Sequence, residues 1–122
     1  MIYTYGQPRI GNMNFQSKVN ELFEGKYFRI THHKDLIPHI PPCVINFSDS
    51  NSYCSEGTGT DLMWYPIHAG IEIFFDGNTD RNYKVCEAVE DTSCSMQYTG
   101  LSVADHIFYM GVYDNCPGDG DH

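Results

Sequence analysis

The spacing of apolar residues changes along the chain in a way that predicts alternating strands and helices. Runs of aromatic and β-branched residues at positions 2–5 and 27–32 have the composition of strands. Between them, Asn12 precedes a segment that Gly25 ends, and apolar residues recur there at helical spacing. The segment is expected to be a helix with one apolar face, made of Phe15, Val19, Leu22 and Phe23. A helix between two strands favours parallel pairing of those strands.

The second half of the chain predicts more loop than regular structure. Residues 36–42 contain three prolines, which lack backbone donors, so this segment is expected to be a loop. Residues 46–62 are polar and rich in Ser, Gly and Asn, and residues 67–75 then predict a third strand. Ser102 is placed to cap a short helix ending at Met110, before Gly111. This order of elements predicts an α/β fold.

The predicted sheet is small for an independent domain. Short sheets with open apolar edges aggregate, so the strand at residues 2–5 is expected to need a neighbouring strand that this chain does not contain. We therefore interpret the 122 residues as part of a larger α/β domain rather than as a complete small one. The domain part is expected to span residues 1–113, and residues 114–122 to form a flexible acidic tail.

Composition and charge narrow the classes of function. Seven basic and sixteen acidic residues give a formal net charge of −9, so no basic surface for nucleic acid is expected. No apolar run approaches the ~20 residues that cross a bilayer, so no transmembrane segment is expected. The first residues lack the charged and apolar regions of a signal peptide. These features leave a globular protein that acts on neither nucleic acid nor, through charge, an anionic membrane.

The cysteines indicate an oxidising environment. The chain has five, at positions 43, 54, 86, 94 and 116, and none forms a Cys-x-x-Cys pair. Scattered cysteines in an acidic chain favour disulfides over a zinc site. The cysteines therefore suggest a secreted protein although the N-terminus does not, and we interpret the disagreement as a missing upstream segment.

Asp35 and His106 are the candidate catalytic pair. Asp35 follows the strand predicted at residues 27–32, where a carboxylate is held rigidly, and His106 comes much later in the chain. A carboxylate can fix the tautomer of an imidazole and stabilise the imidazolium formed in general-base catalysis. α/β hydrolases carry their triad in the chain order Ser, Asp or Glu, His. On position alone, Asp35 could instead be a turn residue and His106 a packed histidine.

Three other histidines raise the question of a metal site. His32 and His33 are adjacent in an extended segment, so their side chains point to opposite faces and cannot easily share a metal. Prolines stiffen the loop around His39, and no second cluster supplies a cysteine or carboxylate at ligand spacing. We predict no metal and no organic cofactor, with His32 or His33 packing or hydrogen-bonding beside Asp35.

Five motifs occur in the same order as in one known family. YTYGQPRIGN, FRITHHKDLIPHIPP, HAGIEIFF, CEAVEDTSC and SVADHIFYMG together resemble the C-terminal half of the fungal-type (class 3) lipases. These are secreted α/β hydrolases that cleave triacylglycerols and related esters, and the match covers about residues 2–111. One motif alone would be weak, but five in order make the resemblance specific. It implies a partial α/β-hydrolase sheet, a lipid ester substrate and an extracellular location.

The resemblance assigns roles to particular residues. The catalytic aspartate of the family falls on Asp35 and its catalytic histidine on His106. In the family the loop after the aspartate helps to wall the acyl site, which implies substrate contacts by Leu36, Ile37 and Ile40.

The resemblance also bears on the disulfides. A family disulfide implies that Cys86 pairs with Cys94, closing a short acidic loop. Cys43 and Cys54 could pair or could both be free, because five cysteines leave the connectivity open. Cys116 is expected to be unpaired in this chain.

The nucleophile of the family is missing from the sequence. It lies in a Gly-x-Ser-x-Gly turn upstream of YTYGQPRIGN, and none of the eight serines here has glycine at both −2 and +2. Without that serine no acyl-enzyme can form, so we expect a truncated lipase-type hydrolase that is inactive alone. The alternatives are a catalytically silent remnant that binds lipid or a partner, and a stand-alone secreted disulfide domain. The sequence predicts no oligomeric state.

Overall fold

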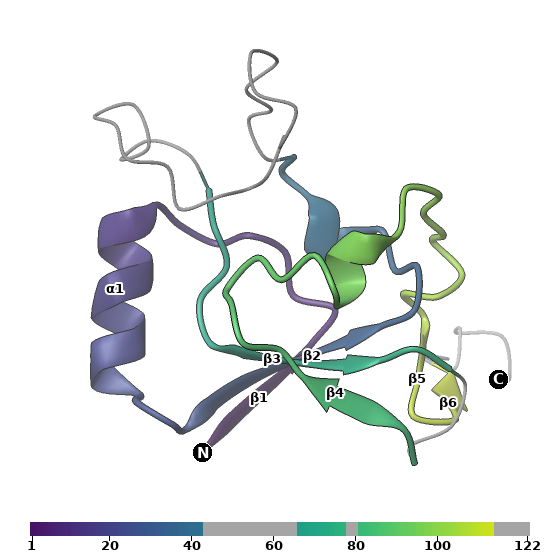
Figure 1. Cartoon of the computed structure of the whole chain (residues 1–122), viewed down its shortest axis with the longest axis horizontal. Coiled ribbons are helices and arrows are strands. Elements are labelled where there is room, and N and C mark those ends of the chain that lie inside the picture. The colour runs from purple at the N-terminus through teal and green to yellow at the C-terminus, as the bar shows by residue number, and fades with distance from the viewer. Residues whose placement is uncertain (43–65, 78–80, 114–122) are drawn as a thin grey trace, which may run out of the picture.

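The computed structural model describes residues 1–42, 66–77 and 81–113. Within these ranges the elements are, in chain order, β1 (Ile2–Tyr5), α1 (Met13–Leu22), β2 (Tyr27–His32), the 3-10 turn η1 (Ile37–His39), β3 (Ile71–Phe75), β4 (Tyr83–Val85), the 3-10 turn η3 (Ser95–Gln97), β5 (Phe108–Tyr109) and β6 (Val112–Tyr113). Figure 1 shows α1 to one side of a central sheet and the turns η1 and η3 close together above it.

The central sheet has four strands in the order β1-β2-β3-β4. β1 pairs with β2 and β2 with β3, both in parallel, whereas β4 adds to β3 in the antiparallel sense. The predicted strands at residues 2–5 and 27–32 and their parallel pairing are confirmed. β1 pairs on one side only among the described residues. The sheet is a partial α/β sheet whose two parallel crossovers bring the carboxyl ends of β1, β2 and β3 to one edge.

Helix α1 begins where its cap residue predicts. The side chain of Asn12 accepts a hydrogen bond from the backbone N–H of Phe15 at 3.0 Å, which satisfies one of the free donors of the first turn. The predicted apolar face is nevertheless not buried in the described part of the chain, because Leu22 is 62% exposed and Phe15 45% exposed. The pattern predicted the helix correctly, but the described residues cover that face only in part, for example where Tyr27 packs edge-on against Phe23.

The third strand is shorter than the prediction for residues 67–75. It begins at Ile71, and the preceding residues are held by other partners. Ile67 donates its backbone N–H to Gly11, and Gly70, at a φ of +86°, donates its N–H to the side chain of Asn20. These contacts with the α1 segment direct residues 67–70 away from the sheet.

The prediction of a helix over residues 102–110 is wrong. Ser102 instead forms an isolated parallel bridge with Asp35, and β5 and β6 form a hairpin. Met110 and Gly111, which connect the two strands, have φ angles of +52° and +82°. Positive φ at both positions is what the type I′ hairpin turn requires, so the Met-Gly pair ends β5 where a helix end was expected.

The interior of the sheet region buries charged side chains as well as apolar ones. Arg29 and Glu72 lie on neighbouring strands, fully buried, with Arg29 Nη2 3.2 Å from Glu72 Oε2. Thr31 Oγ1 donates to Glu72 Oε1 at 2.6 Å. A small apolar cluster lies beside them, made of Phe74, Tyr98, Cys86 and Cys94. No helix within the described ranges is long and apolar enough to cross a membrane.

The predicted disulfide between Cys86 and Cys94 is present, with an S–S distance of 2.05 Å. The other cysteines, the possible pair Cys43 and Cys54 and the expected orphan Cys116, lie outside the described residues, as does the predicted tail over residues 114–122. The pairing of 86 with 94 closes the loop between β4 and η3 against the buried end of Glu72.

Candidate active site

Asp35 lies at the carboxyl end of β2 and is almost fully buried, with a side-chain exposure of 1%. The chain turns through His33, at a φ of +39°, and the N–H of Asp35 then donates to the carbonyl of His32 at 2.9 Å. The carboxylate accepts from three donors: the Ile37 N–H at 2.8 Å on Oδ1, and His106 and the Tyr109 hydroxyl on Oδ2. A buried carboxylate with three donors is stabilised as an anion.

His106 is oriented by this carboxylate. Its Nδ1 lies 3.0 Å from Asp35 Oδ2, and the His106 side chain is 34% exposed. Because an ionised carboxylate can only accept, Nδ1 carries the proton and Nε2 keeps its lone pair. Nε2 has no hydrogen-bond partner within the described part of the chain. The pair therefore presents a free basic nitrogen, backed by a buried anion, as general-base catalysis requires.

The segment that carries His106 is attached along the loop after β2. Ser102 N–H donates to the Lys34 carbonyl at 2.7 Å, and Leu36 N–H donates to the Ser102 carbonyl at 3.2 Å. The Asp105 carboxylate lies 2.9 Å from His33 Nδ1 and accepts from the Lys34 N–H at 3.2 Å. These contacts hold residues 102–105 against residues 33–36, about 70 positions earlier in the sequence, and so place His106 opposite Asp35.

Gly6 provides the space in which the pair meets. It follows β1 with a φ of +55°, and its N–H donates to Ile30 at 2.9 Å. A Cβ at this position would lie 2.7 Å from both Asp35 Oδ2 and His106 Nδ1. Any other residue would displace the carboxylate or the ring. The sequence alone does not reveal this role of Gly6, because the close approach involves two residues far along the chain.

Tyr109 is a second contact that sequence reasoning missed. Its hydroxyl donates to Asp35 Oδ2, and its ring packs edge-on against Tyr5 at 5.9 Å and beside His32 at 5.5 Å. Burial and the hydrogen bond to Asp35 raise the pKa of Tyr109 well above its usual value. The hydroxyl therefore stays protonated and donates. The only feature of the sequence that could have suggested this contact is that Tyr109 follows His106 by three residues.

The other predicted site residues lie on the same loop or beside it. Leu36 and Ile37 are half-buried at the start of η1, whereas Ile40 is exposed at its end. His32 and His33 both contact Asp105, through its carbonyl and its carboxylate respectively. Burial lowers the pKa of His39, which keeps that ring neutral.

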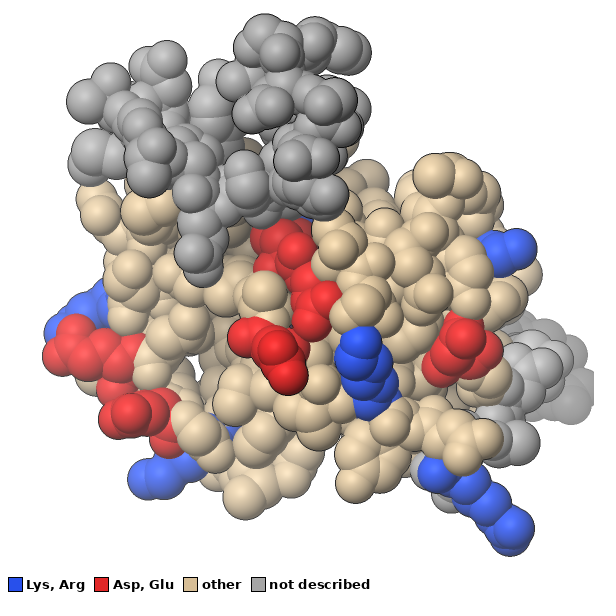
Figure 2. Space-filling model, viewed as in Figure 1, with Lys and Arg blue, Asp and Glu red and all other residues tan. Residues whose placement is uncertain are grey.

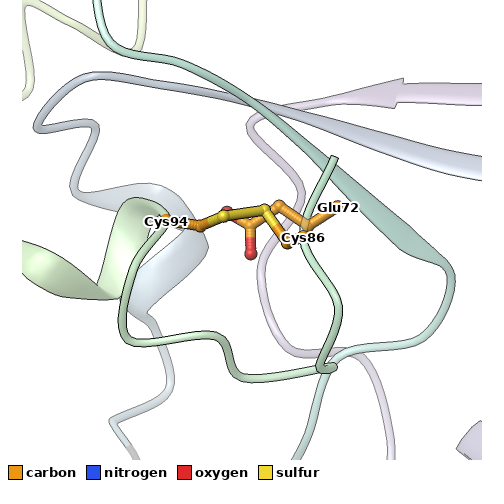
Figure 3. Close-up of side chains that lie close together, drawn as sticks. All are labelled: Glu72, Cys86 and Cys94. Carbon is orange, nitrogen blue, oxygen red and sulfur yellow. A yellow bond between two sulfur atoms is a disulfide. The ribbon is translucent and has the colours of Figure 1, made fainter. Parts of the chain in front are cut away.

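One group of potential metal ligands occurs in the described residues, and its chemistry does not favour a metal. Figure 3 shows the side chains of Glu72, Cys86 and Cys94 converging, with ligand atoms within 4.8 Å of one another. The two sulfurs are bonded to each other, so neither is a thiolate. Both carboxylate oxygens already accept hydrogen bonds, from Thr31 and Arg29.

The surface in Figure 2 carries no basic stripe among its described residues. Its Lys and Arg side chains are separated from one another by uncharged surface and by Asp and Glu. Phosphate backbones need clustered positive charge, and the absence of a nucleic-acid partner stays a prediction from the composition.

A buried aspartate after one parallel strand, hydrogen-bonded to a histidine late in the chain, is the acid–base geometry of α/β hydrolases. The comparisons with known proteins agree with this class. Residues 1–45 match the family model for lipase (class 3). A Caenorhabditis elegans lipase is 31% identical over 91% of this chain, and the secreted mono- and diacylglycerol lipase 1 of Fusarium solani is 29% identical over 94% of it.

Solved structures give the same result. Lipase II of Rhizopus niveus superposes with a TM-score of 0.65 at 25% identity, over 92% of this chain and 35% of that one. The Rhizomucor miehei lipase in its propeptide complex gives 0.62 at 28% identity, over 91% and 30%. The chain is thus similar to class 3 lipases over about nine-tenths of its own length, and its residues 1–45 match their family model. It spans 35% of the length of the C. elegans lipase and 30% of the F. solani lipase.

Proposed function

We propose that this chain supplies the acid, Asp35, and the base, His106, of a serine-hydrolase triad that cleaves lipid esters. The observation that carries the proposal is the 3.0 Å contact between His106 Nδ1 and the buried Asp35 carboxylate, which leaves Nε2 open. The nucleophilic serine would come from outside these 122 residues, since no serine here stands in a Gly-x-Ser-x-Gly turn.

The reaction follows from this geometry. His106 Nε2 would take the proton of the serine hydroxyl as the serine oxygen attacks the ester carbonyl. The resulting imidazolium gives that proton to the leaving alcohol, and an acyl-enzyme is left. Nε2 then takes a proton from water, whose oxygen attacks the acyl carbonyl, and the proton returns to the serine as the fatty acid leaves. Asp35 stays ionised throughout, because its anion has three donors in the folded chain.

A lipid substrate is supported by the loop after Asp35 and by the relatives. Leu36, Ile37 and Ile40 are apolar residues of the loop that follows Asp35, where an acyl chain would contact them. The relatives include a mono- and diacylglycerol lipase and a triacylglycerol lipase. An extracellular location is supported by the disulfide and by the secreted F. solani relative.

The first test is p-nitrophenyl ester hydrolysis by the purified chain. We expect no turnover above that of His106→Ala, because this chain contains no triad serine for His106 to deprotonate. Turnover that depends on His106 would contradict the proposal that the serine lies elsewhere.

The second test supplies the missing part. The region of the Rhizomucor miehei lipase that precedes its match would be fused before residue 1, and tributyrin hydrolysis measured. We expect activity that falls by roughly 10⁴-fold in Asp35→Asn and at least as far in His106→Ala. An active fusion that tolerates both substitutions would refute the assigned roles. A folded fusion without activity would favour the alternative of a silent remnant.

A further inference from the structure

Arg9 is a buried cation that joins two loops. Its side chain is 1% exposed. Nη1 donates to the carbonyls of His39 and Pro41 at 2.8 and 2.9 Å, while Nε and Nη2 donate to the two oxygens of Glu90 at 3.1 and 3.0 Å. One guanidinium thus ties the η1 loop (residues 36–42) to the disulfide loop (residues 86–94). Figure 1 shows η1 close to η3, the turn that follows the disulfide loop.

Glu90 is held as an anion for this contact. Its Oε1 also accepts from the backbone N–H of His68 at 3.2 Å and lies 2.9 Å from His68 Nδ1. Burial raises the carboxyl pKa, but the hydrogen bonds from His68 and Arg9 and the charge of Arg9 outweigh it and lower the pKa of Glu90 to about 2. Burial and the neighbouring Arg29 lower the pKa of His68, so its ring is a neutral donor. The Arg9–Glu90 pair is therefore charged at neutral pH, with both carboxylate oxygens occupied.

The η1 loop depends on donors from outside itself. Its three prolines have no N–H, so its carbonyls cannot all be satisfied within the loop. Arg9 supplies two side-chain donors, and its backbone N–H donates to the Ile40 carbonyl at 3.0 Å. Among the described residues, Arg9 alone donates to the far end of the loop.

The near end of the same loop holds the carboxylate of the active site. Ile37 N–H donates to Asp35 Oδ1 at 2.8 Å, and the turn continues through hydrogen bonds from Ile40 N–H to Ile37 and from His39 N–H to Leu36. A continuous series of hydrogen bonds therefore runs from Glu90 through Arg9 and η1 to Asp35, on the oxygen opposite to the one that orients His106.

We propose that Arg9 and Glu90 are positioning residues for the Asp35–His106 pair, acting through the η1 loop. The proposal takes its functional meaning from the proposed triad, but it is a statement about geometry that needs no substrate. When the Arg9–Glu90 contact is lost, the η1 loop opens, Ile37 N–H leaves Asp35, and the carboxylate is free to rotate away from His106.

The test compares Glu90→Gln with Glu87→Gln by NMR. Glu87 lies in the same disulfide loop but is exposed, so its variant controls for the loss of one negative charge. The readouts are the His106 Nδ1 proton, with its exchange rate and the titration of the ring, and the exchange of the Ile37 amide. We expect Glu90→Gln to speed exchange of both protons by roughly ten-fold or more and to shift the His106 titration, and Glu87→Gln to leave them unchanged.

The amides of the β2–β3 ladder separate positioning from general stability. In Glu90→Gln their exchange is expected to rise only as far as the loss of global stability requires, and by a smaller factor than that of the two site protons, which become exposed by local opening of the η1 loop. An unchanged His106 signal in Glu90→Gln would refute the proposal. Equal acceleration of ladder and site protons would refute it too, since the pair would then be only part of the general fold.

Native-state exchange of the unaltered chain provides a second measurement that needs no variant to fold. The Arg9 Nε proton and the Ile37 amide are expected to open as one unit, with the same opening equilibrium and the same dependence on urea. Different opening equilibria for these two protons would overturn the proposal. Neither measurement uses ester hydrolysis, so an inactive fusion protein would count against the proposed function and leave this result intact.

Discussion

The site region and the region of β1 and α1 bury opposite kinds of side chain. Around the site, the buried residues are charged or polar, and they include Arg9, Arg29, Asp35, His68 and Glu72. In β1 and α1, the large apolar residues are exposed, and they include Tyr3, Tyr5, Phe15 and Leu22. This is the reverse of the usual distribution, in which burial follows hydrophobicity.

The difference shows what holds each region. In the site region every buried charge named above has an opposite charge or a hydrogen-bond donor, and many of these contacts join segments far apart in sequence. The Arg9–Glu90 contact spans 81 residues and the Asp35–His106 contact 71. In β1 and α1 the large apolar side chains make ring contacts, such as Tyr3 with Phe28 and Tyr5 with Tyr109, but they stay about half exposed or more. Substitutions should therefore cost much stability in the first region and little in the second.

Removing the carboxylate of Glu72 should have the largest effect. Glu72→Ala leaves Arg29 buried without its ion pair, which is expected to lower the free energy of unfolding by about 3–5 kcal/mol. Glu21→Ala, which breaks the exposed pair with Lys18, should cost less than about 1 kcal/mol. Urea unfolding of both variants measures the difference, and equal losses would contradict the comparison.

Acid should weaken the site region through Glu90. Its folded pKa of about 2 lies below the ordinary value of 4.5, so its contribution is complete above about pH 4.5 and is lost as the pH falls through 2. The loss amounts to about 3 kcal/mol for this residue. Urea midpoints between pH 6 and 2 should fall more steeply in the unaltered chain than in Glu90→Gln. Parallel pH profiles would show that folding does not lower the pKa of Glu90.

Filling the space at Gly6 should be more costly than the same change at Gly25. Both glycines have positive φ, at +55° and +65°, so alanine strains the backbone at either by about 1 kcal/mol. The added Cβ meets Asp35 and His106 at Gly6 and nothing at Gly25. We expect a total loss of about 2–3 kcal/mol for Gly6→Ala, with a displaced His106 ring signal. Equal losses in the free energy of unfolding for Gly6→Ala and Gly25→Ala would mean that Asp35 and His106 can accommodate the added Cβ.

Removing the hydroxyl of Tyr109 should have a moderate effect. Tyr109→Phe keeps the ring contacts and removes one donor from Asp35, at an expected cost of about 1.5 kcal/mol. Tyr83→Phe, at an exposed tyrosine of β4, should be neutral. Thermal unfolding of the pair measures the difference, and a neutral Tyr109→Phe would show that the other two donors satisfy Asp35 without it.

The smallest effect is expected on α1. Leu22→Gln keeps helix propensity and changes only an exposed apolar side chain, so the free energy of unfolding should change by less than about 0.5 kcal/mol. A loss above about 1 kcal/mol would show that Leu22 is covered in solution, and the contrast between the two regions would then disappear.

The sequence determined the local elements and the residue types of the site. Alternation and composition placed β1 and β2 at their observed bounds, and Asn12 marked the start of α1 through a hydrogen bond within one turn. The order of motifs made Asp35 and His106 the candidate pair, and the Cys86–Cys94 disulfide was implied by the same resemblance. These features depend on neighbouring residues or on motif order, which the sequence contains.

Tertiary structure alone decided how those pieces meet. The segment at residues 102–110 is a bridge and a hairpin rather than a helix, because its backbone finds partners on the loop after β2. Gly6, Tyr109 and the Arg9–Glu90 pair became part of the site only when strands and loops distant in sequence came together. Their importance lies in distances of about 3 Å between residues 30 to 100 positions apart, and no local pattern of polar and apolar residues records such distances.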